Sequence, residues 1–175
     1  MVEKNIFITG FMGTGKSAVG ECLAQKTGKV FLDMDKVIES QEGNSIKEIF
    51  ASKGENYFRS LETRILKEIS SRQGIIVATG GGALLSEENY QLACNGGYIV
   101  LLWATPEVIL ERLKKEKDIR PLLSGSDRLE KIKMLLQQRK EKYNRIKYQI
   151  ETTNLSIDQV AKAIIELFQI KEVIN

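Results

Sequence analysis

One stretch of eight residues near the start of the chain constrains the fold more than any other. Residues 10–17 read GFMGTGKS, which is the pattern G-x-x-x-x-G-K-S of a phosphate-binding loop. An apolar run of strand length, residues 6–8, precedes it, and apolar residues recur at helical spacing after it. A strand, a glycine-rich turn and a helix start form an anion site, because loop N–H groups and the helix dipole favour the same negative charge. The stretch therefore predicts that the chain binds a nucleoside triphosphate.

Residues within this loop have predicted roles that follow from their chemistry. The Lys16 ammonium can reach the β- and γ-phosphates, and the Ser17 hydroxyl can ligate Mg²⁺. We therefore predict Mg²⁺ as the cofactor, Ser17 as one of its ligands and Lys16 as a catalytic residue. The predicted nucleotide-binding residues in this region are Gly13, Thr14, Gly15, Lys16, Ser17 and Ala18.

Short apolar runs alternate with helical segments along the rest of the chain. Ser45 and Ser156 each begin a capping box, and Pro106 suits the first turn of a helix. Alternating strands and helices favour a parallel sheet with helices on both faces. We predict an α/β fold, a three-layer α/β/α sandwich, in a single domain over residues 1–175. The five expected strands lie at residues 6–9, 30–32, 75–78, 98–103 and 148–151.

Composition narrows what the chain can do. None of the 175 residues is histidine, so a general base must be a carboxylate, a lysine, a tyrosine or a cysteine. The formal net charge of +3 is too small to indicate nucleic acid as a partner, and no apolar run is long enough to span a membrane. We expect Cys22 and Cys94 to be small buried residues, which fits a protein of the reducing cytoplasm.

Two aspartates, Asp33 and Asp35, follow the second expected strand. In open α/β sheets, ligands bind beyond the carboxyl ends of the strands. A pair of carboxylates there is well placed for Mg²⁺ and for an incoming hydroxyl group, whose proton a carboxylate can accept. The alternative is that Asp35 caps a helix over residues 36–41 and that the charge is otherwise solvated.

Arg59 and Glu62 lie three residues apart in a segment that we expect to be helical as far as residue 71, so they share one helix face. One interpretation of this spacing is a surface ion pair. The other is that Glu62 holds Arg59 so that its planar guanidinium group can bind an anionic substrate, such as a carboxylate.

Three glycines, Gly80, Gly81 and Gly82, follow the third expected strand, where many phosphate-loop enzymes carry a metal-binding aspartate. Glycines let a ligand approach the backbone closely and leave N–H donors open to it. A plain turn is the alternative interpretation.

A polar connection at residues 114–125 separates two helical segments and contains Arg120. Such a segment could close over the phosphates as a lid, or it could be an exposed loop with solvated charges. The helix expected at residues 127–146 is rich in lysine and arginine, which indicates a mainly solvated face. Its periodicity alone assigns no role to Arg139.

Five motifs in this order resemble those of shikimate kinases. They are GFMGTGKS at residues 10–17, DMD at 33–35, FRSLE at 58–62, GGG at 80–82 and RPLL at 120–123, and the resemblance covers residues 4–168. It implies a P-loop NTPase fold of the nucleoside-monophosphate-kinase type, with a five-stranded parallel sheet, a lid at about 114–125 and a substrate-binding region at about 34–62. It also implies transfer of the γ-phosphate of ATP to the 3-hydroxyl of shikimate, on the route to chorismate and the aromatic amino acids.

On the substrate side, the resemblance implies that Asp35 binds the shikimate hydroxyls and is the candidate base, while Asp33 lies near Mg²⁺. Arg59, oriented by Glu62, grips the shikimate carboxylate together with Arg139, and the glycine backbone meets the substrate. The substrate-binding residues implied in this way are Asp35, Arg59, Gly80, Gly81, Gly82 and Arg139.

On the nucleotide side, the resemblance implies that Arg120 reaches the phosphates from the lid as a catalytic residue. It also implies that Arg112 stacks near adenine. Family members often carry a basic residue and a proline after a Thr-Asn pair. Here the pair at residues 153–154 is followed by Leu155 and Ser156, so the chain departs from the family pattern at this contact.

Other functions remain open on the same motifs. A gluconate kinase or a nucleoside-monophosphate kinase would present Arg59 and Arg139 to a different anion. A GTPase would need an Asn-Lys-x-Asp motif, and the sequence has none. A non-catalytic nucleotide-binding regulator would be expected to have lost Lys16, Asp35 or Arg59, and all three are present. A site made of residues from one chain fits a monomer.

Overall fold

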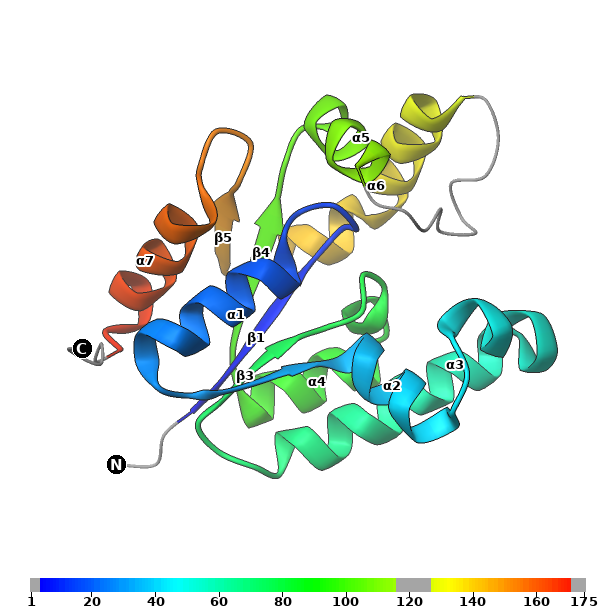
Figure 1. The fold of residues 1–175 in the computed structure, drawn as a ribbon, viewed down its shortest axis with the longest axis horizontal. Helices are drawn as coiled ribbons and strands as arrows, with labels where there is room; N and C mark the ends of the chain where they lie inside the picture. Colours follow the sequence, from blue (N-terminus) through cyan, green and yellow to red (C-terminus); the bar gives the residue numbers. More distant parts are fainter. Residues whose placement is uncertain (1–3, 116–126, 171–175) are drawn as a thin grey trace.

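The computed structural model describes residues 4–115 and 127–170, which form a sheet with helices on both sides (Figure 1). Strands and helices alternate along much of the chain. The elements, in chain order, are β1 (Asn5–Gly10), α1 (Lys16–Thr27), β2 (Val30–Asp33), α2 (Met34–Glu42), α3 (Ile46–Ser70), β3 (Ile75–Ala78), a 3-10 turn η1 (Ala83–Leu85), α4 (Glu87–Gly96), β4 (Gly97–Trp103), α5 (Pro106–Lys114), α6 (Arg128–Asn144), β5 (Tyr148–Glu151) and α7 (Ile157–Phe168).

The sheet has five strands in the order β2-β3-β1-β4-β5, and every neighbouring pair is parallel. The predicted strand positions are confirmed to within one residue at each end. β1 is the central strand, and its Ile6 pairs with Ile76 on one side and Tyr98 on the other. Because all strands run the same way, the segments that follow β1, β2 and β3 emerge at the same edge of the sheet.

Alternate residues of the strands face opposite layers of helices. Ile6 and Ile8 of β1 pack in a buried cluster with residues of α1 and α7, whereas Phe7 packs in a second cluster with residues of α2, α3 and α4. Figure 1 shows α1 and α7 side by side in front of the sheet. Burying such a side chain fully stabilises the fold by roughly 1.5–3 kcal/mol. The three-layer α/β/α arrangement is therefore confirmed.

Several helix starts are also as predicted. Both capping boxes form, with the Ser45 hydroxyl accepting from the Glu48 N–H and the Ser156 hydroxyl accepting from the Gln159 N–H. Pro106 is the first residue of α5. Within α3, Gly54 has φ 79° and ψ 173°, so the helix is interrupted there and resumes shortly before the residues predicted to bind substrate.

The expectation that both cysteines are buried is wrong. Cys22 is half-buried and Cys94 is exposed. On α4 the buried face is formed by Asn89 and Ala93, and the neighbouring position 94 turns outward because successive helical residues lie about 100° apart. Among residues 4–115 and 127–170, no helix is both long and apolar enough to cross a membrane.

Candidate active site

The phosphate loop connects the end of β1 to the start of α1. Gly15 caps α1 with a left-handed backbone (φ 92°), and Gly13 also has a positive φ of 76°, conformations that glycine adopts at little cost. The Thr14 hydroxyl donates to the Phe11 carbonyl at 2.8 Å, and Nζ of Lys16 donates to the same carbonyl at 3.0 Å. The loop therefore closes on itself, with the Lys16 ammonium lying across it.

Asp33 links the end of β2 to both the phosphate loop and α2. Its Oδ2 accepts a 2.5 Å hydrogen bond from the Ser17 hydroxyl, and its Oδ1 accepts from the backbone N–H groups of Asp35 (3.0 Å) and Lys36 (3.4 Å). The interpretation that Asp35 caps this helix is wrong, because α2 begins at Met34 and Asp33 is its N-cap. The extended backbone that a cap needs belongs to the last strand residue, Asp33 (φ −98°, ψ 116°).

Asp35 does not cap α2, and its carboxylate faces the glycine loop. A Cβ atom placed on Gly80 would lie 3.0 Å from Oδ1 of Asp35 and 2.6 Å from Oε1 of Glu62. Two carboxylates from different helices therefore converge on one glycine. The close approach, rather than a plain turn, explains why a glycine stands at this position.

Arg59 is held on α3 by two glutamates. Its Nη1 donates to Oε2 of Glu62 at 2.7 Å, and its Nε and Nη2 donate to Oε1 of Glu55 at 3.2 and 3.0 Å. A Cβ atom on Gly82 would lie 3.0 Å from Nη1, so the guanidinium group contacts the glycine loop. The Glu62 side chain is only 1% exposed, so the interpretation of Arg59 and Glu62 as a surface ion pair is wrong.

The electrostatics of Glu62 follow from its burial. Burial raises the pKa of this carboxyl to about 7, the Arg59 charge opposes the rise, and the neighbouring Asp35 charge adds to it. A carboxyl group that is half ionised near neutral pH therefore stands behind the arginine that we expect to bind an anion.

Arg139 approaches the glycine loop from α6. Its side chain is buried, its Nη1 donates to the Gly81 carbonyl at 3.0 Å, and its guanidinium carbon lies 5.1 Å from the centre of the Phe11 ring. The Tyr143 hydroxyl donates to the same carbonyl at 3.3 Å. The expected solvated face of this helix does not include Arg139. Its inward stripe runs through Ile132, Arg139 and Tyr143, a spacing that was present in the sequence.

Arg112, predicted to lie near adenine, binds the backbone of the phosphate loop. Its Nη1 donates to the Gly13 carbonyl at 3.3 Å and to the Thr152 hydroxyl at 2.9 Å. Sequence reasoning missed Thr152. Arg120 and nearly all of the predicted lid lie outside the described residues, so the role of Arg120 stays a prediction. Of the range 114–125, the structure describes only residues 114 and 115.

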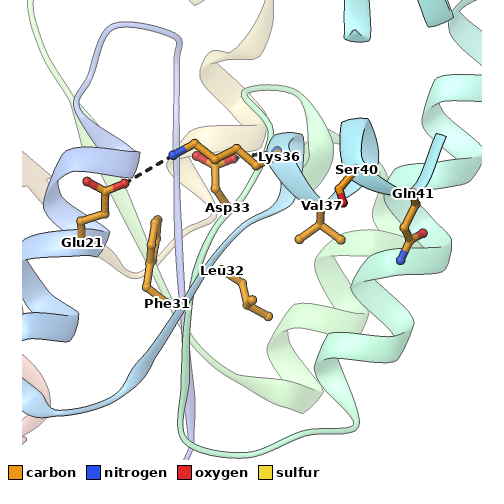
Figure 2. A pocket seen from close by; sticks show the side chains of 8 residues that line it. All are labelled: Glu21, Phe31, Leu32, Asp33, Lys36, Val37, Ser40 and Gln41. Carbon is orange, nitrogen blue, oxygen red and sulfur yellow. Dashed lines mark hydrogen bonds and ion pairs between the residues drawn. The ribbon is translucent and has the colours of Figure 1, made fainter. Parts of the chain in front are cut away.

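An open cavity of about 460 Å³ lies beside β2, and Figure 2 shows the side chains that line it. It is lined by side chains from α1, β2 and α2, among them Phe31, and the ion pair between Glu21 and Lys36 spans it at 3.4 Å. Of the individually predicted site residues, Asp33 alone lines this cavity, and its lining residues from α2 fall within the predicted substrate-binding region at about 34–62. The residues that converge on the glycine loop lie elsewhere.

A phosphate loop follows the central strand, an aspartate is bonded to its serine, and two arginines contact the glycine loop that follows β3. These features define the protein as a P-loop kinase of the α/β class. The family model of shikimate kinase matches residues 12–169. The chain belongs to the shikimate kinase family.

Relatives and solved structures agree with this assignment. The chain is 42% identical over 166 residues to a shikimate kinase of Thermodesulfovibrio yellowstonii, covering 95% of each sequence. It is similar to the structure of an Acinetobacter baumannii shikimate kinase in complex with shikimate, with a TM-score of 0.90, 37% identity, and coverage of 95% of this chain and 93% of that one. A Sinorhizobium meliloti gluconokinase shares the fold alone, at 17% identity and a TM-score of 0.57 over 96% of this chain and 98% of that one.

Proposed function

We propose that the protein transfers the γ-phosphate of ATP to the 3-hydroxyl of shikimate, giving shikimate 3-phosphate and ADP. The observation that carries the proposal is the convergence of Asp35, Arg59 and Arg139 on one glycine loop, next to the strand that leads into the phosphate loop. Shikimate carries a carboxylate and hydroxyl groups on one ring. Two arginines and an aspartate provide donors for the carboxylate and an acceptor for a hydroxyl.

The arginines determine how the acceptor is bound. Arg59 and Arg139 come from two different helices, α3 and α6, and contact Gly82 and Gly81 respectively. Both guanidinium groups are already oriented by hydrogen bonds, so little side-chain freedom is lost when a carboxylate binds. Carboxylate binding at this point places the ring beside Asp35.

Asp35 is the candidate base. It accepts the proton of the 3-hydroxyl as that oxygen bonds to the γ-phosphorus, and the bond between the γ-phosphorus and the bridging oxygen of ADP breaks. Lys16 stabilises the charge on the phosphate oxygens, and Arg120 is proposed to add a second positive charge. Phosphoryl transfer depends mainly on such positioning and charge stabilisation.

The residues present fit a magnesium ion. The Ser17 hydroxyl and the Asp33 carboxylate meet at 2.5 Å beside the phosphate loop, and both are hard oxygen donors of the kind that Mg²⁺ prefers. We propose that Ser17 binds the ion directly and that Asp33 holds it through water. When bound, the ion neutralises charge on the phosphate oxygens.

The proposal extends to the oligomeric state, the domain organisation and the location of the protein. All the site residues named above come from one chain, so we propose that it acts as a monomer. We also propose a single domain and a cytoplasmic location, where ATP is available and free cysteines stay reduced.

The test is ADP release from magnesium ATP with and without shikimate. We expect release that depends on shikimate, with shikimate 3-phosphate as the product. Gluconate and nucleoside monophosphates are the control acceptors. Turnover with one of them in place of shikimate would assign the site to a different acceptor. Tight ATP binding with no turnover on any acceptor would make the protein a regulator.

A further inference from the structure

The guanidinium group of Arg112 joins two segments that are far apart in the sequence. Its Nη1 donates to the Gly13 carbonyl at 3.3 Å and to the Thr152 hydroxyl at 2.9 Å, and its Nη2 donates to the Thr152 carbonyl at 2.6 Å. Gly13 lies in the phosphate loop, whereas Thr152 directly follows β5. One side chain on α5 therefore connects this loop to the end of a sheet strand.

Thr152 extends the connection to the next peptide of the loop. The residue is only 2% exposed. Its hydroxyl oxygen lies 3.3 Å from the Thr14 carbonyl and 3.2 Å from the Trp103 carbonyl, and its backbone N–H donates to Trp103 at 2.8 Å. The loop is thus connected to the ends of both β4 and β5.

Packing against α5 supports the same part of the loop. A Cβ atom on Gly13 would lie 3.1 Å from Cγ of Leu113 and 3.3 Å from the Ile109 carbonyl. Phe11 and Met12 are buried in one cluster with Ile109. The phosphate loop therefore lies directly on α5, and a change in the contacts of α5 must reach the loop.

Peptide geometry gives these contacts a consequence for phosphate binding. In a trans peptide, the C=O and the following N–H point in opposite directions. A Thr14 carbonyl that faces the Thr152 hydroxyl therefore aims the Gly15 N–H the other way. The N–H groups at the start of α1 are those that the loop offers to phosphates.

We propose that Arg112 and Thr152 are positioning residues that hold the Gly13 and Thr14 peptides of the phosphate loop in the orientation that binds phosphate. We call this pair of residues the Arg112–Thr152 clamp. The inference rests on the proposed nucleotide-binding function, and it gives Arg112 a role that does not require contact with adenine. Hydrogen bonds from guanidinium N–H groups do not by themselves prevent the planar group from stacking on a ring, so the two roles must be separated by experiment.

The test uses inorganic tripolyphosphate, which has the phosphates of ATP but no adenine. Its binding, in the presence of Mg²⁺, is measured by calorimetry alongside ATP for Thr152→Val, Thr152→Ser, Arg112→Lys and Arg112→Ala. Because each of these variants removes a hydrogen bond of the charged guanidinium group, we expect both Arg112 variants and Thr152→Val to weaken tripolyphosphate binding by about tenfold or more. The affinity for ATP should fall by the same factor. Thr152→Ser keeps the hydroxyl group and should therefore retain both affinities.

Steady-state kinetics separates positioning from general stability. A displaced loop should raise the KM for ATP and lower kcat, while the KM for shikimate stays unchanged. The matched control is Thr27→Val, which removes a buried hydroxyl bonded to the Leu23 carbonyl at the opposite end of α1. This variant should change thermal stability without changing tripolyphosphate affinity.

Unchanged tripolyphosphate binding in Arg112→Lys, and in Thr152→Val if that variant folds, with ATP binding alone weakened, would overturn the proposal and leave Arg112 as an adenine contact. Arg112→Lys keeps the charge and much of the side chain, so the proposal remains testable if Thr152→Val does not fold. The binding measurement uses no shikimate, so its outcome is independent of which acceptor the enzyme phosphorylates.

Discussion

Nη1 of Arg59 lies 2.7 Å from Oε2 of Glu62, and the Glu62 side chain is only 1% exposed. The other oxygen of the carboxylate, Oε1, is also buried, and no hydrogen-bond donor in the described part of the chain reaches it. Ionised Glu62 therefore has one strong partner and the negative charge of Asp35 nearby. This half-satisfied carboxylate makes the site sensitive to pH.

The stability of the fold should fall as the pH rises towards 7. The pKa of Glu62 is about 7 in the folded protein and 4.5 for the ordinary group, so between these values the folded state holds more protons than the unfolded state. The contribution of Glu62 to the free energy of unfolding is then highest below pH 4.5. It is lost as the pH rises through 7, by up to about 3 kcal/mol. Urea unfolding of wild type and Glu62→Gln across this range measures the effect. A difference between the two proteins that does not change with pH would contradict it.

Shikimate should bind with uptake of a proton. A carboxylate bound at Arg59 brings negative charge near Glu62, which raises the pKa of that carboxyl further. By linkage, shikimate affinity should increase as the pH falls from 8 to 6. Calorimetry at pH 7 in buffers of different ionisation enthalpy measures the proton directly, and Glu62→Gln should abolish the uptake. Equal heats in all buffers for the wild type would exclude this linkage.

The sequence predicts the arrangement of the fold well because its signals are local. The G-x-x-x-x-G-K-S pattern requires a strand before it and a helix after it, and the capping boxes at Ser45 and Ser156 mark helix starts within a few residues. The sequence alone does not show which of Asp33 and Asp35 caps the helix that follows β2, since either side chain can do so. Only the position where the extended backbone ends distinguishes them.

Burial in the site depends on contacts that local patterns do not contain. Spacing places Arg59 and Glu62 on one helix face, but whether that face meets solvent depends on the glycine loop packing over it. The many charged residues around Arg139 indicated a solvated helix face, so its burial was not predicted. Its spacing to Ile132 and Tyr143 nevertheless follows the buried stripe of α6. The Arg112–Thr152 contact joins residues forty positions apart, and no periodicity indicates it.

Removing either arginine should weaken shikimate binding and also destabilise the fold. Arg59→Ala loses a charged contact to the substrate, worth about 1.5–3 kcal/mol in binding free energy, and leaves the buried Glu62 carboxyl without its hydrogen-bond partner. Arg139→Ala should lose a similar amount of binding free energy. It should also lower the stability of the fold, because the Gly81 carbonyl loses a hydrogen-bond donor and the Phe11 ring loses its contact with the guanidinium group. Shikimate titration and thermal unfolding distinguish the two effects. Arg64→Ala, an exposed arginine on the same helix as Arg59, is the control and should change neither quantity.

A methyl group at Gly80 should not be tolerated. The Cβ atom would lie 2.6 Å from Oε1 of the buried Glu62, so Gly80→Ala must displace that carboxylate at a cost of about 1–3 kcal/mol in stability. Gly81→Ala is the matched variant, because its Cβ atom would have no neighbour closer than 3.6 Å. Unfolding free energies of the two variants provide the comparison. Equal stability would mean that Glu62 moves aside freely.

Asp35→Asn should abolish turnover while ATP still binds. The amide keeps the shape of the side chain but cannot accept the hydroxyl proton, and loss of a general base typically costs about 10²–10⁴-fold in rate. Nucleotide affinity should be retained because the phosphate loop, Ser17 and Asp33 are bonded to one another without the Asp35 carboxylate. Asp158→Asn, on the surface of α7, is the matched control and should turn over normally. Wild-type turnover in Asp35→Asn, measured as shikimate 3-phosphate formed, would show that Asp35 does not act as the base.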